Sequence, residues 1–200
     1  SRGVNCTPEQ IIVGAGNDYL LMLLEKTLGR ELSIAMENPT YKRAYRIFRS
    51  FSYPITTVDM DESGMMVEEL RKTNAQLAYV MPSHQYPTGT VMSIGRRMEL
   101  LNWAAEKEDR YLIEDDYDSE FRYATRTIPA MQSLDDGENV IYMGSFNRTI
   151  APSIRVAYMV LPSSLLNLYH KTFSYSSCTV SRFEQQALCR FIQQGLYGRH

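Results

Sequence analysis

Amphipathic helical stretches alternate with short apolar or β-branched runs along most of this chain, and this alternation constrains its fold more than any other feature. Strand-like runs at 77–81 and 111–114, for example, flank a longer helical stretch at 94–108. Strands separated by helices usually pair in parallel, with the helices packed on the sheet. The order therefore predicts an α/β domain with a mostly parallel central sheet flanked by helices.

The same pattern predicts the individual elements. Helices are expected at 18–28, 40–49, 65–72 and 94–108, and strands at 32–36, 55–58, 77–81, 111–114, 140–143 and 156–160. After Pro162 two helices are expected, each with an apolar face: Leu165, Leu168 and Tyr169 on the first, and Phe183, Ala187, Leu188 and Phe191 on the second. Since no recognisable C-terminal cap follows them, we expect the chain to be part of a longer protein.

Composition excludes several classes of protein. The 200 residues are 44% hydrophobic and 22% charged, as is typical of a globular domain. The net charge of -2 gives no basic footprint for nucleic acid. No apolar run reaches the roughly 20 residues that cross a bilayer, and no signal peptide opens the chain, so a cytoplasmic protein is expected. Three cysteines without CxxC spacing favour neither disulfides nor a metal site.

The segment EDDYDSEFRY at 114–123 places several carboxylates directly after an apolar strand. Open α/β sheets bind ligands at the carboxyl ends of their strands, so these acids are candidates for a binding site. Taken alone, they could equally be solvated charges of a surface loop.

Three segments in order give the acids a context: MPSHQYPTG at 81–89, EDDYDSEFRY, and YMGSFNRTIAPSIRVAY at 142–158. With VGAGNDYLL at 13–21 and ENPTYKRA at 37–44, they resemble fold-type I aminotransferases. They are most similar to the aminotransferase-like domain of MocR/GabR-type transcriptional regulators of the GntR superfamily. The resemblance runs from about Val4 to His200. It implies that 1–200 form one domain, a truncated large domain without the winged helix-turn-helix and the C-terminal small domain.

The resemblance implies a site for pyridoxal phosphate (PLP). In this family an aspartate pairs with the protonated pyridine nitrogen, and a tyrosine two positions later approaches the phenolic oxygen. Asp115 and Tyr117 match these positions, and Tyr41 matches the tyrosine that stacks on the ring. The competing interpretation is that Asp115 is an acid of a surface loop and that the two tyrosines are aromatic side chains packed in the core. His84 and Tyr86 are expected near the ring edge, without a proton-transfer role.

The phosphate group needs backbone amides at a helix N-terminus and donors that reach its oxygens. Gly16, Asn17 and Asp18 match the first requirement, and Ser145 and Arg155 match the second. Asp18 departs from the family, because a carboxylate beside a phosphate dianion weakens binding unless its side chain points away. Plain N-capping by Asn17 or Asp18 is the alternative.

Arg43 matches an arginine that holds the carboxylate of an amino-acid ligand in GabR-like proteins. A solvated helix face shared with Lys42 and Arg46 is the alternative. No metal ligands are expected.

Arg148 stands where the family carries the lysine that forms an imine with PLP. A guanidinium that stays protonated cannot form that bond. No other lysine is placed to replace it: Lys26, Lys42, Lys72, Lys107 and Lys171 fall on expected helices or their ends. Noncovalent binding of PLP or a PLP–amine adduct, loss of the cofactor, and deliberate replacement of the lysine all remain open.

These observations predict an effector-sensing domain of a MocR-type regulator, inactive as an aminotransferase. Its ligand would be a small amine or amino acid, and its PLP would be noncovalent. The resemblance further implies a homodimer that contacts DNA only through a missing N-terminal domain. The alternatives are a PLP-dependent aminotransferase whose lysine was mutated, and a cofactor-free dimerisation scaffold.

Overall fold

The computed structural model describes residues 2–29, 31–118, 128–136, 138–146 and 154–197. A central sheet has the strand order β1-β8-β7-β6-β5-β2-β3-β4. Its strands are β1 (Ile11–Gly14), β2 (Ile34–Asn38), β3 (Ile55–Asp61), β4 (Gly64–Met65), β5 (Leu77–Val80), β6 (Tyr111–Asp116), β7 (Val140–Ser145) and β8 (Ala157–Val160). The helices are α1 (Asn17–Leu28), α2 (Lys42–Ser50), α3 (Val67–Arg71), α4 (Ile94–Ala105), α5 (Ser163–Phe173) and α6 (Arg182–Gln193), with short 3-10 turns at Pro8–Gln10 and Met131–Ser133.

The middle of the sheet is parallel. Strands β3, β2, β5, β6 and β7 pair in parallel, whereas β8 is antiparallel to both β7 and β1, and β4 forms a hairpin with β3. The predicted fold class, an α/β domain with a mostly parallel sheet, is therefore confirmed. The parallel strands bring their carboxyl ends to one edge, where ligands bind in this class.

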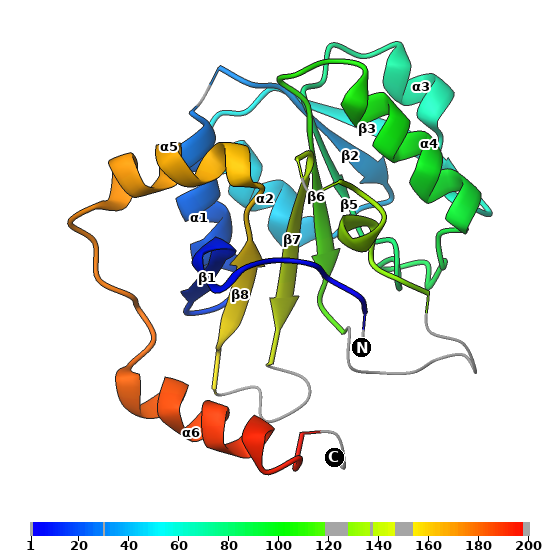
Figure 1. The fold of residues 1–200 in the computed structure, drawn as a ribbon. Coiled ribbons are helices and arrows are strands. Elements are labelled where there is room, and N and C mark those ends of the chain that lie inside the picture. Colours follow the sequence, from blue (N-terminus) through cyan, green and yellow to red (C-terminus); the bar gives the residue numbers. More distant parts are fainter. Residues whose placement is uncertain (1, 30, 119–127, 137, 147–153, 198–200) are drawn as a thin grey trace.

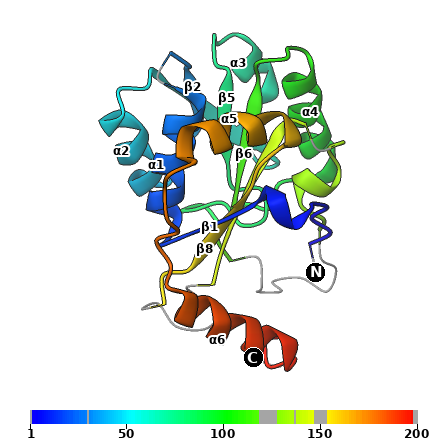
Figure 2. The ribbon, with the colours of Figure 1, turned by 60° about the vertical axis from the view of Figure 1, so that its left-hand side comes forward.

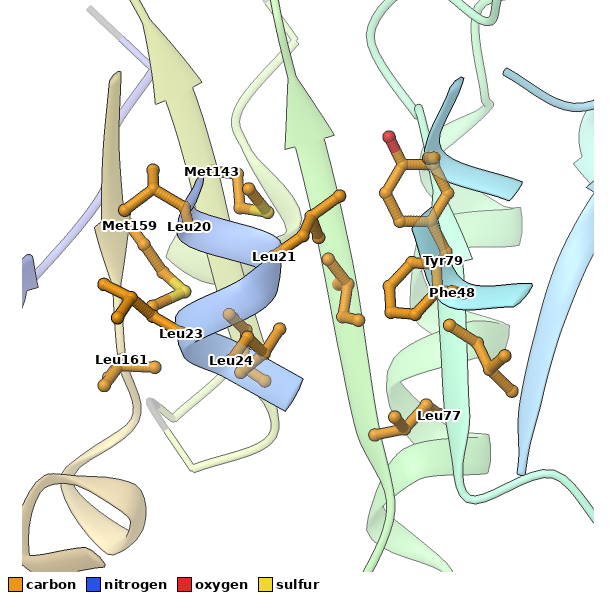
Figure 3. Close-up of a cluster of buried hydrophobic side chains, with 14 of the residues drawn as sticks. Leu20, Leu21, Leu23, Leu24, Phe48, Leu77, Tyr79, Met143, Met159 and Leu161 are labelled. Carbon is orange, nitrogen blue, oxygen red and sulfur yellow. The ribbon is translucent and has the colours of Figure 1, made fainter. Parts of the chain in front are cut away.

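Helices cover both faces of the sheet. Helices α1, α2 and α5 lie on one face, and α3 and α4 lie on the other (Figure 1 and Figure 2). Strand β5 shows why both faces are apolar: Leu77 and Tyr79 face the α1 side, whereas Ala78 and Val80 face the α4 side. Figure 3 shows the first core, in which four leucines of α1 pack near methionines of β7 and β8. They are Leu20, Leu21, Leu23, Leu24, Met143 and Met159.

The last two helices differ in how they pack. In α5, Leu165 is buried and Tyr169 packs against the core, but Leu168 is 43% exposed. In α6 no residue is buried, and Phe183 is 83% exposed. The prediction of two helices is confirmed, but the apolar face of α6 has no core to cover within the described residues, because α6 lies away from the sheet (Figure 2).

The alternation in the sequence does not predict β1 and β4. A run of four residues, Ile11–Gly14, and a pair, Gly64–Met65, are too short to show a period, and pairing with a neighbouring strand makes them strands. Among the described residues, no helix is both long and apolar enough to span a membrane.

Candidate functional site

A cavity of about 520 Å³ lies at the carboxyl ends of the central strands. The ends of β5, β6 and β7 contribute Tyr79, Met81, Asp115, Tyr117 and Ser145. The other groups proposed from the sequence lie at the starts of α1 and α2, except Arg155, which lies just before β8. Together, the cavity lining contains every predicted cofactor or ligand residue that the structure describes: Gly16, Asn17, Asp18, Tyr41, Arg43, Asp115, Tyr117, Ser145 and Arg155. Arg148 lies outside the described residues.

Asp115 is 3% exposed and both of its carboxylate oxygens have protein donors. The Tyr79 hydroxyl donates to Oδ2, and Asn17 Nδ2 donates to Oδ1 across 3.1 Å. Burial raises the pKa of Asp115 to about 7; the bond from Tyr79 opposes this shift, and the nearby Asp116 and Asp118 add to it. The carboxyl group is thus fixed at the cavity wall, where it can accept a hydrogen bond from a protonated ring nitrogen.

The neighbouring acids are buried as well. Glu114, Asp116 and Asp118 are at most 2% exposed, so the interpretation of this segment as a solvated loop is wrong for its described part. Glu114 accepts the backbone N–H groups of Met131 and Gln132, at 2.9 and 3.0 Å. Of the four acids at 114–118, Asp115 lines the cavity, whereas Glu114, Asp116 and Asp118 do not.

Tyr79 was not identified from the sequence. It is fully buried in β5, lines the cavity and donates to Asp115. Burial is the first cause that raises its pKa well above the usual value, followed by the charge of Asp115. The only signal in the sequence is a hydroxyl-bearing side chain within an otherwise apolar strand.

Aromatic side chains form another part of the wall. Tyr41 and Tyr86 both line the cavity, with ring centroids 5.8 Å apart in an edge-on arrangement. The Tyr117 hydroxyl lies 3.2 Å from His84 Nδ1, which is also 2.7 Å from Asp118 Oδ2. His84 therefore contacts Tyr117 but does not line the cavity, whereas Tyr86 does.

The backbone at the start of α1 lies close to Arg155, with no side chain between them. Gly16 has φ 93°, a conformation that side chains disfavour, and a Cβ there would lie 3.4 Å from Arg155 Nη2. Gly16 is the N-cap residue and no side chain caps α1. N-capping by Asn17 or Asp18 is therefore wrong: the Asn17 side chain binds Asp115, and the Asp18 side chain binds an arginine.

Asp18 does not point away from the cavity. Arg43 Nη2 donates to its Oδ2, and Arg155 Nη2 lies 3.6 Å from the same oxygen. Arg43 is about half exposed, yet it lines the cavity, so it is more than part of a solvated helix face. Ser145 is buried and its hydroxyl lies 3.4 Å from the carbonyl of Tyr117.

No lysine lines this cavity among the residues that the structure describes. All five lysines of the chain fall in the described ranges, so none of them contributes a primary amine to the wall.

Comparison with known proteins shows what this chain is similar to. The family model described as aminotransferase class I and II matches residues 1–194. YdeL, an HTH-type transcriptional regulator of Bacillus subtilis (strain 168), is 44% identical over all of this chain. The probable rhizopine catabolism regulatory protein MocR of Rhizobium meliloti is 37% identical, also over all of it. The chain spans only 43% and 41% of these two proteins.

The fold also matches solved structures. A kynurenine aminotransferase of Pyrococcus horikoshii, in complex with PMP, has a TM-score of 0.85 and 28% identity. The match covers 95% of this chain and 49% of that protein. The similarity to fold-type I enzymes and to HTH-type regulators that the motifs indicated is thus confirmed.

Proposed function

This chain belongs to the aminotransferase class I and II family, and on that basis we propose that it is the effector-sensing domain of a MocR-type transcriptional regulator, with a noncovalent site for PLP or a PLP–amine adduct. The observation that carries the proposal is the cavity itself. It joins an aspartate for the ring nitrogen with an arginine and a helix start for the phosphate, while no lysine among the described residues reaches it.

The residues present fit the cofactor. Asp115 would accept from the ring nitrogen, Tyr117 would approach the phenolic oxygen, and Tyr41 would lie against the ring. The bare backbone at Gly16 leaves room for a phosphate that Arg155 and Ser145 would bind. When bound, PLP supplies an aldehyde that reacts with amines and a ring that accepts electrons.

Sensing rather than catalysis follows from what these residues can do. A guanidinium that stays protonated is neither an imine-forming amine nor a general base, so Arg148 cannot replace the lysine. Arg43 would hold the carboxylate of an amino-acid effector. The relatives are HTH-type regulators, so an N-terminal domain would contact DNA in the cytoplasm, and a homodimer would complete the two sites.

The test is an absorbance titration of the purified protein with PLP, followed by borohydride reduction and intact mass. We expect saturable binding without a covalent adduct, and binding of an amino acid should perturb the spectrum. A reduced adduct on any lysine would contradict the noncovalent site. No saturable binding would instead favour a dimerisation scaffold without cofactor.

A second candidate is an aminotransferase whose lysine was replaced, which the similarity to the kynurenine aminotransferase favours. Arg148→Lys separates the two candidates. If the variant forms a reducible adduct and transfers amino groups, the result supports the aminotransferase. An adduct without amino-group transfer supports the sensor.

A further inference from the structure

One carboxylate of the cavity lining contacts two arginines. Asp18 Oδ2 accepts from Arg43 Nη2 and lies 3.6 Å from Arg155 Nη2. Asp18 belongs to the first turn of α1, and Arg43 to the first turn of α2. The two arginines that could hold incoming anions therefore share an internal counter-ion.

The charges of the described cavity lining nearly cancel. Arg43 and Arg155 carry two positive charges and Asp18 carries one negative charge. Asp115, whose pKa burial raises to about 7, adds a second negative charge when it is ionised. A phosphate dianion would thus enter a site with at most one net positive charge and meet a carboxylate on its own arginine. Because like charges at this range repel, Asp18 beside Arg155 disfavours a bound phosphate.

We propose that Asp18 is an internal competitor for anions, which sets how tightly this site holds a phosphate group. The inference rests on the proposed function only for the identity of the phosphate-bearing ligand. With Asp18 present, that ligand binds more weakly and dissociates more readily than it would with a neutral side chain at position 18.

A structural role for the same ion pair predicts something different. Asp18 could serve only to join α1 to α2 through Arg43. The side chains of Arg43 and Asp18 are 55% and 34% exposed, and ion pairs with such exposure contribute little to stability. A purely structural pair predicts a lower melting temperature for Asp18→Asn and no gain in phosphate affinity.

The experiment titrates inorganic phosphate, and separately PLP, into the purified protein and its Asp18→Asn variant by calorimetry. Asp18→Asn should bind inorganic phosphate about tenfold more tightly at low salt, and this gain should shrink at high salt, because it is electrostatic. Asp18→Ser, a second neutral variant, should show the same gain. Asp136→Asn, which changes an exposed aspartate remote from the cavity, should show none.

A third variant tests the mechanism. In an Arg155→Gln background, Asp18→Asn should tighten phosphate binding less, because the contested arginine is gone and only the direct repulsion between Asp18 and the phosphate is relieved. Unchanged or weaker phosphate binding in both neutral variants, with melting curves that show folded protein, would overturn the inference.

The outcomes also separate the inference from the proposed function. If Asp18→Asn tightens inorganic phosphate but neither protein binds PLP, the inference stands and the proposed cofactor is wrong. If the unmodified protein binds PLP and the neutral variants bind neither ligand more tightly, the proposed cofactor stands and the inference is wrong.

Discussion

Asn17 Nδ2 donates a hydrogen bond to Asp115 Oδ1 across 3.1 Å, which joins the first residue of α1 to the end of β6. The bond connects two parts of the candidate site, since Asn17 belongs to the turn proposed to bind the phosphate and Asp115 is proposed to face the ring nitrogen. Tyr79 donates to the other oxygen of the same carboxylate. The orientation of Asp115 is therefore set by the protein before any ligand enters.

Asp115→Asn should weaken PLP binding by tenfold or more, about 1.5–3 kcal/mol, because a hydrogen bond to a charged group is lost. The measurement is an absorbance titration of both proteins. Asp136→Asn, at an exposed position, is the matched control and should bind as the unmodified protein does. Equal affinity of Asp115→Asn and Asp136→Asn would show that Asp115 does not face the ring nitrogen.

Arg2→Met should destabilise the fold strongly. Arg2 binds Asp116 through two hydrogen bonds of 2.9 Å, and Asp116 is fully buried. Removal of Arg2 leaves a buried carboxylate without its cation, which costs about 3–5 kcal/mol. Urea denaturation measures the loss in free energy of unfolding.

Two further variants make this test specific. Arg71→Met breaks an exposed pair with Glu106 and should cost no more than about 1 kcal/mol. The double variant Arg2→Met, Asp116→Asn should recover part of the stability, because the uncompensated charge is removed. A cost for Arg2→Met as small as that for Arg71→Met would contradict the prediction.

Glu37→Gln should reduce the loss of stability as pH rises from about 4.5 to 8. Glu37 is fully buried in β2, and burial raises its pKa to about 8, against the weaker opposing effects of bonds from Gln85 and the Met81 backbone. The native state therefore binds this proton more tightly than the unfolded state, whose pKa is near 4.5. Stability from this group is present at low pH and falls as pH rises from about 4.5 to 8.

Glutamine cannot ionise, so the variant should lose less stability across this window, with a difference on the order of a few kcal/mol. The measurement is urea denaturation between pH 5 and pH 9. Glu114 and Asp115 have pKa values near 7, so the change in the free energy of unfolding between about pH 7 and pH 8 comes mainly from Glu37. Glu31→Gln, at an exposed position, is the control. A pH dependence identical in all three proteins would rule out an ionising Glu37.

Gly144→Ala should cost about 1–3 kcal/mol through overpacking. A Cβ at Gly144 in β7 would lie 2.5 Å from Cζ of Tyr158, so the tyrosine ring or the strand must move. Since Ser145 follows directly, phosphate binding should also weaken. Gly95→Ala, on an exposed part of α4 where the new Cβ has room, should instead raise the melting temperature slightly.

Much of the fold and part of the site could be predicted from local pattern. The helix predicted at 94–108 and the strands predicted at 77–81 and 111–114 are confirmed at Ile94–Ala105, Leu77–Val80 and Tyr111–Asp116, because the helix has an apolar face and each strand contains a continuous apolar run. Asp115, Tyr117 and Arg155 were identified because they stand in long, distinctive segments. Tyr79 was missed because an isolated tyrosine in a strand of four residues carries no such segment.

The sequence by itself determined the class of fold, the family and the edge of the sheet where the site lies, since these depend on residue types at fixed short spacings. Only the tertiary structure decided which side chains meet. Asn17 binds Asp115 across 98 positions, and Asp18 turns to Arg43 and Arg155 instead of capping its helix. The apolar face of α6 remains exposed although its period is that of a packed helix. Such pairings depend on strand register and helix packing, which bring distant residues together and which no local pattern encodes.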